Sequence, residues 1–262
     1  MSIFRNIFGL TGPGSPPPTF AVDPVTLAAA RRVERGGHCA CLEPRGKRGA
    51  PSVPRLHSDI QDSSAPGWQA LLALIAEGDT AAAAGFEPSA GMPADRWSGV
   101  IALPPEMQSL AGIRHLRLYG SHLRRLPPEI GRLEAMENLD IYTSYSLHWL
   151  PYEITRCARL RETRMSTRAL YGNAKTRLPF PRLSGPVDVL VPGTCSVCDG
   201  PFGESRPQVL WTTQRIGTDI APLLIHSCST GCTGRVPDAP KGYHSRPHRG
   251  GGGVGMPDPD FD

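Results

Sequence analysis

A short pattern that begins with Leu-Pro recurs through the middle of the chain and restricts its fold more than any other feature. It starts at Leu103, Leu126, Leu150 and Leu178, so that the spacings are 23, 24 and 28 residues. Seven apolar positions keep the same order in the first two units, and the third unit keeps most of them. The prolines inside each period exclude one long amphipathic helix, because proline interrupts a helix. Units that cannot bury their leucines alone are expected to stack on one another.

The pattern resembles the leucine-rich repeat family, in the form L-P-x-x-I-x-x-L-x-x-L-x-x-L-x-L-x-x-N-x-L. The resemblance covers 103–183 and implies a short solenoid of the α/β class. In it, each L-x-L is a strand with alternate side chains inward, and each Pro-Pro-Glu starts a helical or 3₁₀ return segment. Two departures predict an irregular third unit: Thr163 replaces a strand leucine, and the usual Asn position holds Ser121, Ser144 and Arg168.

The segments on either side of the repeats are expected to differ from them. Residues 66–77 carry apolar side chains at helical spacing, so 65–102 is expected to be a helical cap over the first unit. Residues 1–64 are expected to be largely irregular or disordered. A small cysteine-rich module is expected at 184–235, and a disordered tail, rich in Gly, Pro and Asp, at 236–262.

Four of the seven cysteines form two close pairs: Cys195 with Cys198, and Cys228 with Cys232. A tight turn aims both thiolates of such a pair at one cation, and two pairs supply the four soft ligands of a tetrahedral zinc site. Strand-like or apolar stretches at 187–191, 208–214 and 221–225 give a layout similar to a zinc ribbon. We expect a structural zinc ion, because four thiolates leave no coordination position open for a substrate.

Other interpretations of this cluster stay open. Two disulfides would need an oxidising compartment, a redox C-x-x-C would need a βαβ setting, and the thiols can also be unrelated. His226 could replace Cys228 or Cys232, because C-x-x-x-C departs from the commoner C-x-x-C spacing. His244 and His248 lie in the Gly-rich tail and are expected to be solvated.

The remaining cysteines are not expected to carry chemistry. Cys157 takes an apolar position of the third unit, which predicts a buried thiol. Cys39 and Cys41 form an isolated C-x-C beside His38, and two ligands at this spacing give poor zinc geometry. We interpret them as free thiols in a loop, with a catalytic thiol as the alternative.

The polar residues that alternate with the strand leucines are expected to form a concave binding face. They are His115, Arg117, Tyr119, Asn138, Asp140, Tyr142, Glu162, Arg164 and Ser166. Across the units, Arg117, Asp140 and Arg164 would form a ladder of alternating charge. Exposed Tyr beside Arg is typical of protein-binding hot spots. The alternative is that the ladder only stabilises the sheet.

Charge and motifs favour a binding protein over an enzyme. The net charge is +4, and 103–183 holds 13 Arg or Lys against 7 Asp or Glu. None of the G-x-x-x-x-G-K-[ST], G-x-S-x-G and H-E-x-x-H motifs occurs. We therefore expect a monomeric, cytoplasmic protein that binds another protein, without a membrane span. A nucleic-acid-binding zinc ribbon with a basic repeat surface is the alternative, although few cations flank the cysteines.

Overall fold

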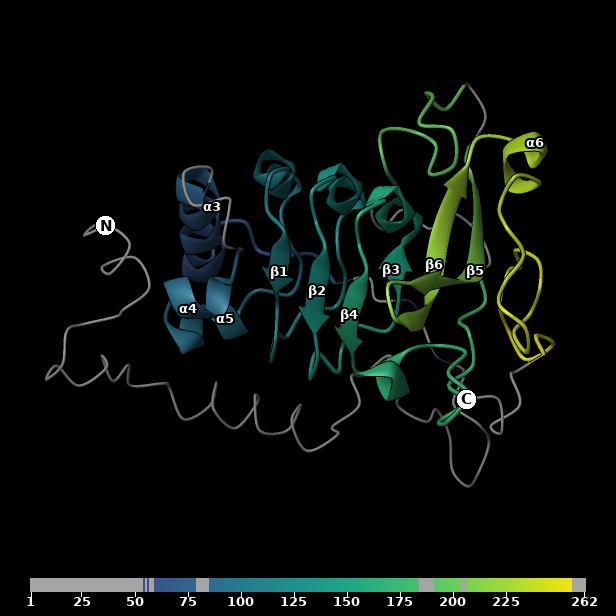
Figure 1. The fold of residues 1–262 in the computed structure, drawn as a ribbon, viewed down its shortest axis with the longest axis horizontal. Helices are drawn as coiled ribbons and strands as arrows, with labels where there is room; N and C mark the ends of the chain where they lie inside the picture. Colours follow the sequence, from purple (N-terminus) through teal and green to yellow (C-terminus); the bar gives the residue numbers. More distant parts are fainter. Residues whose placement is uncertain are drawn as a thin grey trace, which may run out of the picture.

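The structure is a computed structural model that describes residues 54, 56, 59–78, 85–183, 191–203 and 206–255. Its fold is of mixed α/β type, with short helices and two three-stranded sheets arranged in one row (Figure 1). None of the helices in these residues has the length and hydropathy that a membrane crossing requires. His38, Cys39 and Cys41, and most of the expected strand at 187–191, lie outside the described residues.

Three α-helices lie at the end of the row nearest the N-terminus (Figure 1). They are α3 (Pro66–Gly78), α4 (Pro88–Gly91) and α5 (Ala94–Ser98). The predicted helix at 66–77 is confirmed by α3, which buries Leu71 and Ile75. Phe86 pairs with Leu116 in an isolated parallel bridge, so this segment adjoins the edge of the first sheet. The helices therefore cover the first repeat unit, where the sequence places them.

The first sheet takes one strand from each of the three repeat units. Its strands are β1 (His115–Arg117), β2 (Asn138–Ile141) and β4 (Glu162–Met165). They are parallel in the order β1-β2-β4 and pair equivalent positions, so that Arg117 lies opposite Asp140 and Asp140 opposite Arg164. The predicted lateral order of the charged residues is confirmed.

Each Leu-Pro pattern is followed by a short 3₁₀ helix. These are η2 (Pro105–Leu110), η3 (Pro128–Arg132) and η4 (Tyr152–Arg156), and successive helices contact one another. The prolines begin the first two helices, where a missing N–H removes no hydrogen bond. At Gly131 the approach is closest, since a Cβ there would lie 2.5 Å from the Glu153 carbonyl oxygen. Glycine at this position lets η3 and η4 pack together.

We expect Gly131→Ala to lower the free energy of unfolding by about 2 kcal/mol, because the added methyl group would push η3 away from η4. Urea denaturation followed by circular dichroism would measure the loss. Gln108→Ala is the matched control, since Gln108 takes the equivalent position of the first unit and is exposed. Equal stability of both variants would contradict the close approach.

The repeated apolar positions form one continuous core. All seven positions of the first and second units are buried, and in the third unit only Leu160 and Thr163 are half-buried. Cys157 is buried as predicted, and burial raises the pKa of its thiol to about 12. Ser121 and Ser144 are also buried, with their hydroxyl groups 2.8 Å apart. They provide polar contacts at the usual Asn position of the first two units.

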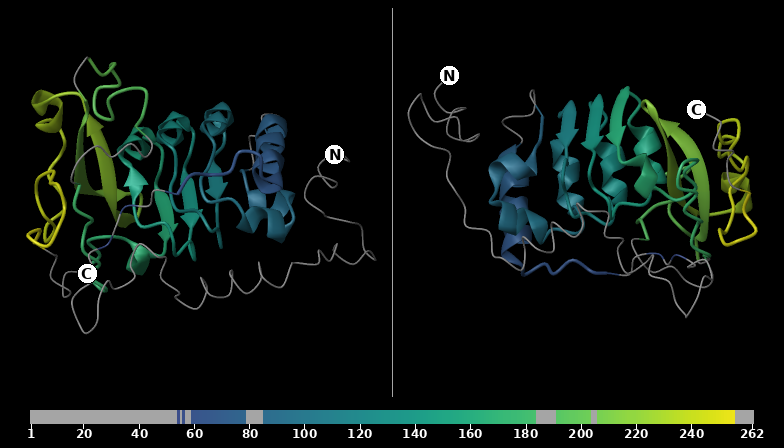
Figure 2. Two further views of the ribbon diagram at one scale, coloured as in Figure 1. Left: turned by 180° about the vertical axis from the view of Figure 1, so that it is seen from behind. Right: turned by 90° about the horizontal axis from the view of Figure 1, so that it is seen from below.

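A β-hairpin continues the row beyond the third unit, as seen from three directions (Figures 1 and 2). Its strands are β5 (Gln208–Ile216) and β6 (Asp219–Ser227), and β6 also pairs in parallel with β3 (Leu150–Pro151). The strand expected at 208–214 is confirmed, and the apolar stretch at 221–225 lies within the second strand. Leu223 and Ile225 of the hairpin share the core of the repeat units. The cysteine-bearing segment is thus continuous with the repeats, which the sequence does not predict.

Thr163 owes its polar side chain to the hairpin. Its hydroxyl donates to the Ile216 carbonyl oxygen at 2.8 Å and contacts an Asp219 carboxylate oxygen at 2.9 Å. Gly217 turns the hairpin with a φ of +56°, and a Cβ there would lie 2.8 Å from Thr163 Cγ2. A leucine at 163 would lack these hydrogen bonds and would be too large for the close approach of Gly217. The replacement of the repeat leucine by Thr163 therefore occurs where the hairpin packs on β4.

The prediction of a disordered tail at 236–262 is wrong for the part that the structure describes. Trp211 of β5 and His248 exchange both backbone hydrogen bonds, at 2.8 and 2.9 Å, and Leu183 N donates to Arg249 O. The His248 ring lies 4.7 Å from Phe180, so it is not solvated as expected. The tail is ordered because it pairs with the outer edge of β5 and packs on the apolar surface around Trp211. The amino-acid composition of the tail gives no information about these contacts with other segments.

Candidate metal centre

Two chain turns bring the paired cysteines to the same end of the hairpin. Cys195 and Cys198 lie in a turn that is closed by a hydrogen bond from Cys195 N to Gly200 O at 2.8 Å. Cys228 follows β6 directly, and Cys232 lies in α6 (Thr230–Thr233). The Ser229 side chain caps α6 by accepting from Cys232 N. Each cysteine pair is positioned by its own turn, and the β5–β6 hairpin joins the two turns along the chain.

The four sulfur atoms have the separations of a tetrahedral thiolate site. Every pair of Sγ atoms lies within 4.8 Å, with 3.8 Å between Cys198 and Cys228 and 3.5 Å between Cys228 and Cys232. A Zn–S bond of 2.3 Å requires about 3.8 Å between ligands in a tetrahedron. All four are free thiols rather than disulfides. The predicted set of four cysteines is therefore brought together and can hold a metal ion.

Hydrogen bonds to the sulfur atoms favour the thiolate at two of the four cysteines, Cys195 and Cys232. Burial alone would raise the pKa of Cys195, but backbone N–H groups, including those of Cys198 and Cys228, lower it below its usual value. Arg235 donates to Cys232 Sγ at 2.7 Å and lowers the pKa of this thiol to about 6. The Cys228 thiol donates to Cys232, which raises its pKa to about 12. A metal ion bound to Cys228 would displace the proton of this thiol.

His226 is not part of the compact cysteine group. Its side chain is buried, its Nε2 atom has no hydrogen-bond partner among the described residues, and burial lowers its pKa to about 4. Its backbone instead holds the first turn, since His226 N donates to Ser196 Oγ and Ser196 N donates to His226 O. The suggestion that His226 replaces a cysteine gains no support from this arrangement.

Sequence reasoning missed how the first cysteine turn is attached to the repeats. The Asp199 carboxylate lies 3.0 Å from both Arg132 of η3 and Arg156 of η4. Arg156 also donates to the carbonyl oxygens of Cys195 and Ser196 at 3.1 Å. The sequence contains one signal of this attachment. Arg132 and Arg156 occupy equivalent positions of the second and third units, and Asp199 directly follows the C-x-x-C pair.

We expect Asp199→Asn to retain the metal-binding cysteines but to loosen the attachment of their turn to η3 and η4. The free energy of unfolding should fall by only ~1 kcal/mol, because the Asp199 carboxylate is over one-third exposed. Metal stoichiometry and urea denaturation would measure the two effects separately. Asp238→Asn serves as control, because Asp238 is exposed. A larger loss in the control than in Asp199→Asn would contradict the assignment.

Glu153 of η4 lies buried beneath the same turn. Its carboxylate accepts from the Ser196 hydroxyl, while its Oε1 atom has no partner among the described residues. Burial raises the pKa of Glu153 above its ordinary value. Folding therefore favours the protonated acid, so this group stabilises the fold below about pH 4.5 and the contribution is lost as pH rises through the folded-state pKa.

Glu153→Gln is accordingly expected to raise the free energy of unfolding at pH 7 by roughly 1 kcal/mol. The amide is neutral at every pH, so folding no longer buries a carboxylate charge. The gain should shrink when denaturation is repeated at pH 4. Glu129→Gln is the comparison, since Glu129 takes the equivalent position in the second unit. A gain that persists unchanged at pH 4 would show that burial of the carboxylate is not its cause.

The expected binding residues lie along one face of the first sheet. Tyr119 and Tyr142 are 49% and 38% exposed, with ring centres 6.2 Å apart. Arg164 Cζ lies 4.5 Å from the Tyr142 ring centre and 3.5 Å separates its guanidinium from Asp140.

The outer residues of the face differ in their freedom to bind. Asn138 donates to Glu162 at 3.3 Å, which joins the neighbouring units beside His115. Ser166 instead accepts from Thr143 N at 2.8 Å and supports the turn after β2. The two tyrosines and Arg164 are exposed parts of this face, as are Arg117 and Glu162.

Comparison with known proteins adds no family. No protein-family model matches the chain, and a search of curated proteins finds no significant match.

Proposed function

We propose that this chain is a non-enzymatic binding protein whose repeat units form a leucine-rich repeat solenoid with a protein-binding concave face. The parallel pairing of β1, β2 and β4, the adjacent 3₁₀ helices and the buried leucines support the solenoid. Stacked units give an extended, rigid surface rather than an enclosed pocket, and such surfaces suit protein partners.

The observation that carries this proposal is the exposed group of Tyr119, Tyr142 and Arg164. Arg164 lies over both rings, at 5.8 and 4.5 Å from their centres. Stacking holds the three side chains in place before a partner arrives, so less side-chain entropy is lost on binding. Tyr and Arg are also the residues most enriched among those that dominate binding energy.

The paired charges of this face favour a protein over a nucleic acid. Arg117 lies 3.5 Å from Glu87, and Arg164 lies 3.5 Å from Asp140. A nucleic-acid surface needs cations that remain available to neutralise phosphates. Arg117 and Arg164 each lie beside a carboxylate, which makes them less suited to neutralise phosphates.

We assign the four cysteines a structural zinc ion that fastens the last part of the solenoid. Soft thiolates at tetrahedral separations suit zinc, and four protein ligands leave no open position for catalysis. The ion would join the turns at 195–198 and 228–232, which flank the hairpin on the third unit. It would therefore close the C-terminal end of a monomeric repeat protein.

The test is a pull-down with the immobilised full chain, repeated with Tyr142→Ala and Arg164→Ala. We expect a specific protein whose dissociation constant rises about tenfold in each variant. Arg159→Ala is the control, because Arg159 is exposed and lies outside the face. Recovery that is equal for the wild type and both face variants would refute the proposed binding surface, and retention on RNA or DNA at physiological salt would favour the alternative.

A further inference from the structure

The four cysteines of the metal centre divide into an inner and an outer pair. Cys195 and Cys232 are buried, whereas Cys198 is exposed and Cys228 is half-buried. The sulfur atoms of the outer pair, Cys198 and Cys228, lie 3.8 Å apart and belong to different turns. The sulfur atoms of a disulfide bond lie about 2.05 Å apart, so a small displacement of two accessible side chains would allow this bond.

Hydrogen bonds hold the inner sulfur atoms in place. Cys195 Sγ accepts from Cys228 N at 3.3 Å, and Cys232 Sγ accepts from the Arg235 guanidinium at 2.7 Å. The sulfur atoms of Cys228 and Cys232 are also close, at 3.5 Å, but this contact lies within one turn and includes the buried sulfur atom that Arg235 contacts. An oxidant from solvent therefore reaches Cys198 first, because its thiol is the exposed one of the four.

We propose that hydrogen peroxide oxidises Cys198 and that Cys228 then closes a disulfide bond with it. The Cys198 thiolate attacks one peroxide oxygen, the O–O bond breaks, and the departing hydroxide takes a proton from solvent to form water. The Cys228 sulfur then attacks the resulting sulfenic acid, so that the S–S bond forms as the S–O bond breaks. The Cys228 proton leaves with the hydroxyl group as a second water molecule. The two sulfur atoms lose two electrons in total, which reduce the peroxide.

The disulfide bond changes how the two cysteine turns are joined. It leaves two thiols, which are too few for a tetrahedral site, so a bound ion is released. This release, unlike the disulfide bond, rests on the zinc ion proposed above. The bond links residues 198 and 228 directly, so the two turns stay joined after the ion has left. The cysteine end of the molecule therefore has two fastened states, one with the ion and one with the disulfide bond.

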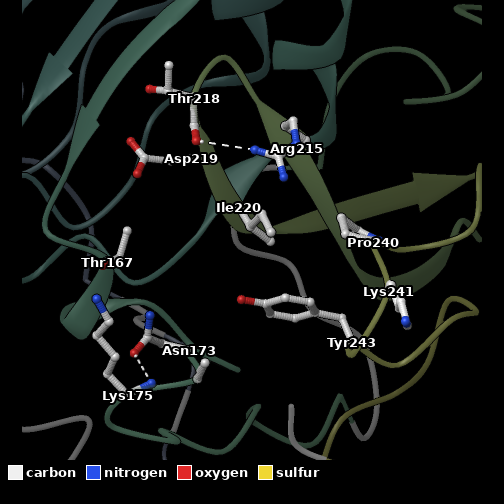
Figure 3. A pocket seen from close by; sticks show the side chains of 11 residues that line it. Thr167, Asn173, Lys175, Arg215, Thr218, Asp219, Ile220, Pro240, Lys241 and Tyr243 are labelled. Carbon is white, nitrogen blue, oxygen red and sulfur yellow. Dashed lines mark hydrogen bonds between the residues drawn. The ribbon is translucent and has the colours of Figure 1, made fainter. Parts of the chain in front are cut away.

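At its other end, the β5–β6 hairpin is held without the cysteines. Figure 3 shows this end, where Arg215 of β5 donates to the Thr218 carbonyl oxygen at 3.4 Å in the wall of a pocket of about 490 Å³. The Thr218 hydroxyl donates to the Thr163 carbonyl oxygen on β4 at 2.9 Å. Oxidation should therefore alter hydrogen exchange at the cysteine turns and leave it unchanged at 215–219.

The experiment treats the full chain with hydrogen peroxide, after Cys39→Ser and Cys41→Ser have removed the two thiols of the N-terminal region. Mass spectrometry would identify the disulfide bond, a chromogenic chelator would measure released metal, and dithiothreitol would test reversal. We expect one bond between Cys198 and Cys228 per chain, release of one metal ion, and recovery of both thiols with the reductant. Cys157 is the internal control, because its buried thiol should stay reduced.

Urea denaturation tests the second fastened state. The oxidised protein should unfold at a higher urea concentration than the reduced protein without metal, and equal midpoints would refute the covalent fastening. A disulfide bond within one turn, Cys195 with Cys198 or Cys228 with Cys232, would overturn the proposal, as would four unmodified thiols after peroxide treatment. A protein that carries no metal should still form the bond between Cys198 and Cys228, so failure of the zinc assignment and failure of this proposal are distinguishable.

Discussion

Removal of the metal ion is expected to unfold the cysteine-bearing end of the molecule and to destabilise the hairpin packed on the third repeat unit. The free energy of unfolding should fall by ~3 kcal/mol or more. Structural zinc ions bind their sites with a free energy of about 10–16 kcal/mol, and this binding energy stabilises the folded state. The effect should spread beyond the site, because the ion would join the two turns that bracket β5 and β6. Chelation followed by urea denaturation and metal analysis would measure it.

Cys232→Ser should reproduce the effect of chelation, with less than one metal ion bound per chain. Cys157→Ser is the matched control: this thiol is also buried but donates to the Ile130 carbonyl oxygen at 3.2 Å, a contact that a hydroxyl can keep. Its metal content should equal that of the wild type. One firmly bound metal ion in Cys232→Ser, or unchanged stability after chelation, would contradict the structural role.

The second large effect is expected from Trp211→Ala. The indole is fully buried, its ring centre lies 5.7–6.0 Å from those of Phe180, Tyr171 and Trp149, and its Nε1 donates to Pro181 O at 3.0 Å. Truncation of a buried aromatic side chain costs about 3–5 kcal/mol. It would also remove the surface against which the tail is ordered, so stability and tail order should fall together.

Urea denaturation would measure the stability, and tryptic cleavage after Arg249 would measure the exposure of the tail. Trp68→Ala provides the comparison, because Trp68 is only half-buried and lies on α3 at the other end of the row. Its loss should be clearly smaller and should leave Arg249 protected. A variant Trp211→Ala that keeps both wild-type stability and a protected tail would show that this cluster does not order the tail.

The sequence predicted the elements whose determinants are local. The helix α3, the strand β5 and the buried leucines follow from patterns within single segments. The four candidate ligands could also be predicted, because each pair lies within one turn. That the pairs meet was an inference from coordination chemistry, and the 3.8 Å between Cys198 and Cys228 agrees with it.

The features that escaped prediction all depend on contacts between distant segments. β3 has two residues, too few to show a pattern, yet it fixes β6 onto the repeats. The ionic contact of Asp199 with Arg132 and Arg156 joins side chains from three separate segments. The tail was misjudged because its order depends on the open edge of β5. Thr163 was recognised as a departure, but only the hairpin explains it.

The attachment of the hairpin to the third unit also determines where further repeat units could be added. Because Gly217 lies against Glu162 and Thr163 on β4, and β6 pairs with β3, the lateral face that a fourth unit would use is already occupied. Elongation by duplication is therefore compatible with insertion between the first and second units, but not with addition after the third. The hairpin turn also covers part of the outer edge of β4, since Thr163 N donates to Thr218 Oγ1, and this hinders end-to-end pairing with a second chain.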